Sequence, residues 1–383
     1  MDELIKKYTE KLFTQGLTEK DSPLFGALET EIIWNRKSND SKILNILFNH
    51  LNINILLFSE PVEPYKSIIN YLTDIYPQVI KPEDSETRTF LHELPVINKF
   101  DPELIIKKLK QRKSVIVKNR GIVTYGTISP EQAFVTYSSV CFACYVKFFS
   151  DYLKSRKNSN KDTKIEKIFN KIIDKINFLP DSFSPLMKSP FKEKDVYKAI
   201  IQAGKLVVNY KLVDSYFGNI SYFFNNIIYI SQTASSLDEL ESCIDPCPVD
   251  NSSCAGITAS SEFSAHKQVY LDTNNKAILH GHPKFSVILS LDCDYNDCEF
   301  KGDCHIKCTK NRAVNDIPIV PGEVGTGKYG LCNTMPKAIK GKRGVIVYGH
   351  GLFTVGKKDF NEAFFNLLQI EKECQKEYFE RIK

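Results

Sequence analysis

The chain has 383 residues, of which 42% are hydrophobic and 25% are charged, the balance of a protein that folds around a buried core. This composition excludes a disordered, collagen-like or coiled-coil chain, and the length suits two domains of average size. The net charge of +5 is small and spread along the chain, so it gives only weak support to nucleic-acid binding.

The amino terminus, Met1-Asp2-Glu3-Leu4, is charged and has no apolar signal-peptide core. No uninterrupted apolar run reaches the ~18 to 20 residues that cross a bilayer. We therefore expect a cytoplasmic protein with neither a membrane nor a nucleic-acid partner. In a reducing compartment, clustered cysteines indicate metal binding or free thiols before disulfides.

The sequence contains two copies of one pattern. Residues 115–126 and 345–356 each predict a buried strand, a glycine turn and a second strand, and an amphipathic helix follows each. Two further segments pair in the same order: 63–69 with 282–288, and 24–26 with 216–218. We interpret the chain as two α/β units over residues 1–157 and 193–383, joined by a linker with a helix over residues 158–192.

The two copies differ in their histidines. His280 and His282 align with residues 61–63, and His350 aligns with Arg120, so the first copy has no imidazole at these positions. The sequence therefore predicts one metal-binding half and one degenerate half without metal ligands.

His280 and His282 close an apolar strand, and alternate residues of a strand share one face, so both imidazoles can reach one ion. His350 lies between Gly349 and Gly351, which leave room for a metal and a substrate. Three neutral imidazoles with an open fourth position are the ligand set of a catalytic zinc site. The alternative is three ordinary surface or core histidines.

Further motifs accompany the histidines, in this order: Gly218-Asn219-Ile220-Ser221, Thr233, Ser260-Ser261-Glu262, His266, His280-Gly281-His282-Pro283 and Gly349-His350-Gly351. Together they resemble the class II aldolase/adducin family of fuculose-phosphate aldolase type. The resemblance covers most of residues 193–383 and extends more faintly over residues 1–157. It implies a three-layer α/β/α fold with a mostly antiparallel sheet, present twice.

The resemblance also implies residue roles. His280, His282 and His350 would bind Zn²⁺ or another divalent metal, and Glu262 would be the acid/base carboxylate. The positions that would hold a substrate phosphate are Gly218, Asn219, Thr233, Ser260 and Ser261. Two departures bear on phosphate recognition: Ala234 replaces the usual glycine after Thr233, and no basic residue follows the Gly-Asn-x-Ser motif.

The function implied is that of a zinc-dependent lyase of aldolase type that acts on a small sugar or sugar phosphate. A sugar-phosphate epimerase and a dehydratase are alternatives that share the metal, and a non-catalytic, adducin-like interaction module is an alternative of another class. Members of this family commonly form four-fold tetramers. Two duplicated chains would then form a homodimer with the shape of a tetramer, and a monomer is the alternative.

Cys293, Cys298, Cys304 and Cys308 lie close together in the sequence. Such a group indicates a second metal centre, either a structural zinc or an iron–sulfur cluster. Because this group contains no C-x2-C pair, free or disulfide-forming thiols are the alternative.

Overall fold

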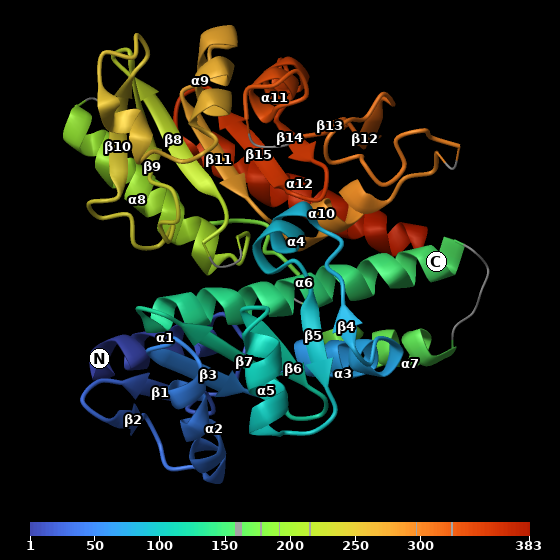
Figure 1. Cartoon of the computed structure of the whole chain (residues 1–383). Helices are drawn as coiled ribbons and strands as arrows, with labels where there is room; N and C mark the ends of the chain where they lie inside the picture. The colour runs from blue at the N-terminus through green and yellow to red at the C-terminus, as the bar shows by residue number, and fades with distance from the viewer. Residues whose placement is uncertain (158–162, 177, 191, 214–215, 296, 323–324) are drawn as a thin grey trace. The chain divides into compact units, whose positions relative to one another are not determined.

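The computed structural model describes residues 1–157, 163–176, 178–190, 192–213, 216–295, 297–322 and 325–383 (Figure 1). The chain divides into two compact units, Met1–Asn177 and Phe178–Lys383. The division lies inside the expected linker, of which residues 158–162, 177 and 191 are outside the described residues. The helix expected in the linker is present as α7 (Thr163–Ile172).

The first unit has a seven-stranded sheet in the order β2-β1-β3-β7-β6-β5-β4. The strands are β1 Leu24–Leu28, β2 Ile32–Trp34, β3 Ile55–Ser59, β4 Val79–Ile80, β5 Leu94–Ile97, β6 Ser114–Val117 and β7 Gly121–Gly126. The helices, besides α7, are α1 Asp2–Thr14, α2 Asn39–His50, α3 Tyr65–Ile75, α4 Ser85–Leu91, α5 Pro102–Leu109, α6 Pro130–Lys157 and the short η1 Ile173–Lys175. Helices α2 and α5 pack on one face of the sheet, and α6 packs on β3, β6 and β7 and contacts α1, α3 and α4.

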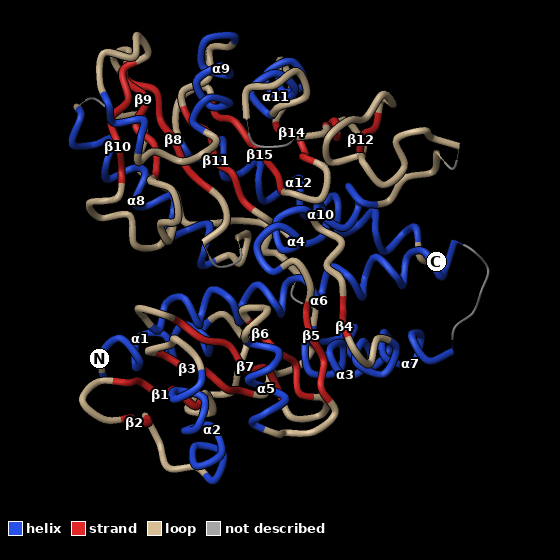
Figure 2. The backbone as a smooth tube through the Cα atoms, in the orientation of Figure 1, coloured by secondary structure: helices blue, strands red, loops and turns tan. Residues whose placement is uncertain are grey.

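The second unit has an eight-stranded sheet in the order β10-β9-β8-β11-β15-β14-β13-β12. The strands are β8 Asn219–Phe224, β9 Ile227–Ser231, β10 Ile244–Pro248, β11 Ala277–Gly281, β12 Arg312–Val314, β13 Ile317–Val320, β14 Gly344–Val347 and β15 Gly351–Gly356. The helices are α8 Glu193–Asn209, η2 Cys254–Ile257, α9 Phe263–Asp272, α10 Lys284–Leu291, α11 Leu331–Ile339 and α12 Phe360–Arg381. Helices α9 and α11 share one apolar core with the sheet, and α8, α10 and α12 form a second group of helices in contact with the strands (Figure 2). The expected α/β class is confirmed.

The two sheets have corresponding strand orders. In each sheet one pair is parallel, β5–β6 in the first and β13–β14 in the second, and the other described pairs are antiparallel. Val117 pairs with Gly121 as Val347 pairs with Gly351, so the ungapped alignment of residues 115–126 with 345–356 agrees with the strand register.

The pairing of residues 63–69 with 282–288 agrees with the starts of α3 and α10, whereas the strand positions before these helices and the pairing of 24–26 with 216–218 need a correction of three residues. Phe58 pairs with Val123 as His280 pairs with Phe353, so Phe58 occupies the strand position of His280, three residues before the one expected at Pro61. The loop from β3 to α3 spans residues 60–64, whereas residues 282–283 join β11 to α10, and the sequence alignment followed the helices. Likewise Leu24, rather than a residue three positions later, occupies the position of Asn219.

Helix α6 is the one helix, among the described residues, that is long and apolar enough to cross a membrane by length and composition. The apolar window of this helix is 94% buried within the protein. Phe148 and Phe149, for example, are both completely buried, and they contact each other edge to face. Such burial is typical of a core helix.

Candidate metal centre and active site

Three histidines converge at one end of the second sheet. His280 lies in β11, His282 follows that strand directly, and His350 lies in the turn between β14 and β15. Because β11 pairs with β15, the residues at 280–282 and 350–352 are brought side by side. All three imidazoles are buried.

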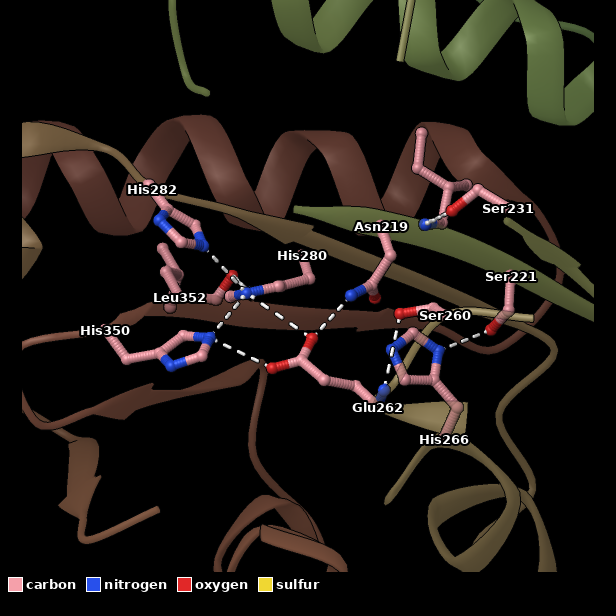
Figure 3. A network of polar contacts seen from close by, with 11 residues as sticks. Asn219, Ser221, Ser231, Ser260, Glu262, His266, His280, His282, His350 and Leu352 are labelled. Atoms are coloured by element: carbon pink, nitrogen blue, oxygen red, sulfur yellow. Dashed lines mark hydrogen bonds and ion pairs between the residues drawn. The ribbon is translucent and has the colours of Figure 1, made fainter. Parts of the chain in front are cut away.

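The Nε2 atoms of the three rings point toward one another (Figure 3). The Nε2 atom of His280 lies 3.0 Å from that of His282 and 3.1 Å from that of His350. Tetrahedral zinc with Zn–N bonds of about 2.05 Å would place such atoms about 3.3 Å apart. The donor set and its spacing therefore fit one divalent ion, and the ligand atoms lie within 4.8 Å of one another.

The surroundings of the His280 and His282 rings favour the neutral form that can bind a metal. Nδ1 of His280 lies 3.2 Å from the Leu352 carbonyl oxygen, and a proton donated there leaves the Nε2 lone pair for a metal. The same ring stacks on Phe353 with centroids 3.7 Å apart. Burial, together with the neighbouring His280 and His350, lowers the pKa of His282 well below its usual value, so this ring is neutral.

Glu262 lies immediately before α9, with its carboxylate against the histidine cluster. Its Oε1 is 2.9 Å from Nε2 of His350, and its Oε2 is 3.6 Å from Nε2 of His280. The Asn219 side-chain amide donates a hydrogen bond to Oε2. Burial alone would raise the pKa of Glu262, but the two histidines and the hydrogen bonds hold it well below its usual range. The carboxylate is therefore ionised.

Glycine at two positions allows the close approach of these segments. A Cβ atom on Gly351 would lie 2.5 Å from the Gly281 carbonyl oxygen and 2.7 Å from Cε1 of His280. A Cβ atom on Gly218, whose φ is +103°, would lie 2.6 Å from the His280 carbonyl oxygen. Both glycines are thus explained by packing around the histidines.

The residues expected to hold a substrate phosphate divide into two groups. Asn219 and Ser260 are buried beside Glu262, and the Ser260 hydroxyl accepts a hydrogen bond from the Glu262 backbone N–H. Thr233 and Ser261 are exposed.

The backbone hydrogen bonds of the loop that follows β9 bear on phosphate recognition. The backbone N–H groups of Thr233 and Ser260 donate to the carbonyl oxygens of Thr258 and Ser231, and so are already used. Ala234 has a φ of 59°, in the left-handed region that favours glycine. The substitution noticed in the sequence therefore falls where the backbone conformation calls for glycine.

His266, which the motif contains without an assigned role, belongs to a buried network. Its Nδ1 is 2.7 Å from the Ser221 hydroxyl, which is 2.7 Å from the Tyr270 hydroxyl. Burial lowers the pKa of His266 to about 3, so the ring is neutral. The sequence analysis did not identify this network. It also missed the contact of His280 with the Leu352 carbonyl oxygen, because a backbone acceptor carries no residue-type signal.

Over the described part of the chain, the cysteine group does not assemble a second metal centre. Cys293, Cys298, Cys304 and Cys308 are free and half-buried. The Cys304 and Cys308 thiols donate to two separate carbonyl oxygens, those of Phe300 and Lys310. Among the described residues, the three histidines form the group of metal-binding side chains that converges, and the cysteines are not part of one.

The first unit fills the corresponding place with other side chains. Phe58, at the strand position of His280, packs against Phe100 with ring centroids 4.9 Å apart. Arg120, at the position of His350, lies over the Phe100 ring and forms a 2.8 Å ion pair with Asp40. An aromatic pair and an ion pair therefore stand where the second unit has its histidines.

The family-model comparison concerns the second unit. Residues 198–378 match the model of the Class II Aldolase and Adducin N-terminal domain. Among curated proteins, none matches the chain. The chain is similar to the crystal structure of L-fuculose-1-phosphate aldolase from Thermus thermophilus, with 22% identity and a TM-score of 0.40 over 49% of this chain and 95% of that one. It is also similar to a sugar-phosphate aldolase from Thermotoga maritima, with 16% identity and a TM-score of 0.36 over 49% and 94%. By this match, residues 198–378 are similar to the class II aldolase and adducin family.

Proposed function

We propose that this protein is a zinc-dependent lyase of aldolase type that acts on a small sugar or sugar phosphate. The observation that carries the proposal is the Glu262 carboxylate, held 2.9 Å from Nε2 of His350 beside three converging imidazoles. The family match at residues 198–378 supports the reaction class. The substrate class rests on the sugar-phosphate aldolases to which the chain is similar.

The chemistry divides between a metal and the carboxylate. A divalent ion held by His280, His282 and His350 would supply the Lewis acid that polarises a ketone or enediolate oxygen. Glu262 would move the proton on the adjacent carbon or hydroxyl. Asn219 holds Oε2 by a hydrogen bond, which leaves Oε1 as the oxygen for the substrate proton. When Nε2 of His350 coordinates a metal it carries no proton to share with Oε1.

Asn219 has a further capacity. Its Oδ1 is buried and has no hydrogen-bond partner among the described residues. A buried acceptor without a partner costs about 1–3 kcal/mol, so a substrate hydroxyl that donates to Oδ1 would gain a hydrogen bond at an already desolvated site. Asn219 would thereby orient both the carboxylate and the substrate.

Glu262→Gln tests the assignment. The variant should keep its zinc and lose about 100-fold or more of the turnover, since an amide cannot take the proton. Metal analysis and proton exchange on a dihydroxyacetone-type ketone measure the two effects. His350→Ala is the companion variant and should lose both zinc and exchange.

Two outcomes and one further measurement separate the possibilities. Wild-type exchange in Glu262→Gln would refute the acid/base role. Loss of zinc in that variant would make Glu262 a ligand. Product analysis with a sugar phosphate distinguishes carbon–carbon cleavage from epimerisation and dehydration.

We also propose that the chain is a tandem duplication, with domains at 1–157 and 193–383 and a first domain that binds no metal. The corresponding strand orders and the shared position of the parallel pair support the duplication. The side chains that fill the first unit's site, Phe58, Phe100 and Arg120, favour a non-catalytic role for that unit, as in an adducin-like interaction module.

A further inference from the structure

We propose that two buried side chains, Glu371 and Ser290, are positioning residues that hold the turns carrying His282 and His350; the inference rests on the proposed metal site. Neither residue belongs to a motif that the sequence offers. Both act through α10, the helix that follows His282.

Glu371 holds the first turn of α10. This residue of α12 is 4% exposed, and its two carboxylate oxygens accept hydrogen bonds from the backbone N–H groups of Phe285 at 2.7 Å and Ser286 at 2.8 Å. Helix α10 begins two residues after His282, with Pro283 between them. Fixing the first turn of the helix therefore fixes the direction in which the chain leaves His282.

Burying the Glu371 carboxylate at the start of α10 costs desolvation free energy. Burial raises the pKa of Glu371 to about 7, against the lowering effect of the two backbone hydrogen bonds. A neutral or locally supplied cap would satisfy the same N–H groups at a smaller desolvation cost.

Ser290 ties the other end of α10 to the His350 turn. The side chain is completely buried, and its Oγ accepts a 2.8 Å hydrogen bond from the backbone N–H of Gly349. The hydroxyl in turn donates to the Val287 carbonyl oxygen, 2.6 Å away. Gly349 has a φ of +61° and directly precedes His350. One short helix thus links the two turns that carry two of the three ligands.

Arg312 holds the carboxyl-terminal end of the same helix. Its guanidinium donates to the carbonyl oxygens of Ser290 at 2.6 Å and Asp292 at 2.7 Å. With Glu371 at one end and Arg312 at the other, α10 has little freedom to shift along its axis.

The first unit offers an internal comparison. Thr124 donates to the Ala133 carbonyl oxygen as Thr354 donates to that of Ala363, which aligns α6 with α12 and places Cys141 at the position of Glu371.

Helix α3 is the counterpart of α10. Its first turn is held by the nearby Glu63, which accepts from the Ser67 backbone N–H at 3.1 Å. Since Ser67 corresponds to Ser286, Tyr71 stands at the position of Ser290, and its ring packs edge to face on Phe148.

The turn that precedes His350 has a counterpart with a similar backbone conformation in the first unit. Asn119 has a φ of 58°, like the 61° of Gly349. The fold therefore forms this turn without Glu371 and Ser290, and the two residues occur together with the metal ligands in the second unit.

Ser290→Ala and Glu371→Gln test the inference in the full-length chain. Zinc affinity, measured by competition with a chelator of known affinity, should fall about 10- to 100-fold in each variant. The visible spectrum of the cobalt(II)-loaded protein reports ligand geometry and should change in both. Glu63→Gln is the matched control, since it weakens the equivalent helix cap in the first unit and should leave zinc affinity and the cobalt spectrum unchanged.

The outcomes are separable. Wild-type zinc affinity and an unchanged cobalt spectrum in both variants would overturn the positioning role while leaving the proposed function intact. A wild-type chain that binds neither zinc nor cobalt would overturn both. If Glu371→Gln does not fold, as judged by circular dichroism, Ser290→Ala decides, because it removes a single hydroxyl.

Discussion

Gly351 is the residue on which the closeness of the ligand turns depends. A Cβ atom there would lie 2.5 Å from a backbone oxygen, 2.7 Å from the His280 ring and 2.9 Å from the His282 ring. Real Cβ atoms essentially never make such contacts, so Gly351→Ala must move a strand or two ligands. Overpacking of this kind costs about 1–3 kcal/mol, and we expect zinc affinity to fall at least about tenfold.

Gly327→Ala is the control for this prediction, since a Cβ atom on Gly327 meets nothing within 4 Å. Chelator competition on both variants measures the difference. Equal and undiminished zinc affinity in Gly351→Ala would show that the backbone relaxes around the new methyl group without disturbing the rings.

Helix α4 illustrates how an element can depend on pH. Its N-cap residue Asp84 is fully buried and accepts hydrogen bonds from the backbone N–H and hydroxyl of Thr87. Burial raises the pKa of Asp84 from 3.8 to about 6, although the Thr87 hydrogen bonds lower it. Because the folded state holds this proton more tightly than the unfolded state, the stability it contributes is full below about pH 4 and is lost as the pH rises to about 6.

Asp84→Asn removes this titration while keeping a side chain that can cap the helix. Between pH 4 and pH 7 the free energy of unfolding of the variant should rise relative to wild type by about 2–3 kcal/mol. Trp34, the single tryptophan, lies in β2 of the same unit. Urea unfolding followed by tryptophan fluorescence therefore reports on the unit that contains Asp84. A difference between the two proteins that is the same at both pH values would contradict the assignment.

At the scale of the whole molecule, we expect one zinc ion per chain of 43.8 kDa. The second unit offers three converging imidazoles, whereas the first has Phe58, Phe100 and Arg120 at the corresponding place. Metal analysis of the purified chain should give one equivalent, and His350→Ala should give none. A second equivalent that survives in His350→Ala would point to a site outside the histidine cluster.

We propose that two chains associate into a homodimer that resembles a tetramer of single units. If the first unit is a copy without metal ligands, as proposed, it still has surfaces to bury, and closed symmetry satisfies them. Light scattering at micromolar concentration should give a mass near twice 43.8 kDa. A strictly monomeric mass would reject the assembly.

The sequence by itself determined those features that local patterns record. The spacing of His280 and His282 at a strand end placed two rings on one face, and the glycines beside His350 marked a tight turn. The resemblance to the class II aldolase/adducin family, carried by motifs in the sequence, implied Asn219, Ser260 and Glu262 as the remaining neighbours of the site, and the structure brings all of these residues together. The repeat at 115–126 and 345–356 likewise predicted strands whose register agrees in the two sheets.

Only the tertiary structure decided the features that depend on how distant elements meet. Glu371 lies 86 positions from the N–H of Phe285 that it holds, and Ser290 lies 59 from that of Gly349, so no local period reveals either contact. The three-residue offset between strands and helices came from unequal loops, which an ungapped comparison cannot register. The cysteines were close in sequence and yet form no shared site among the described residues. Proximity along the chain fixes spacing, whereas a ligand set requires side-chain directions that only the packed sheet and its helices impose.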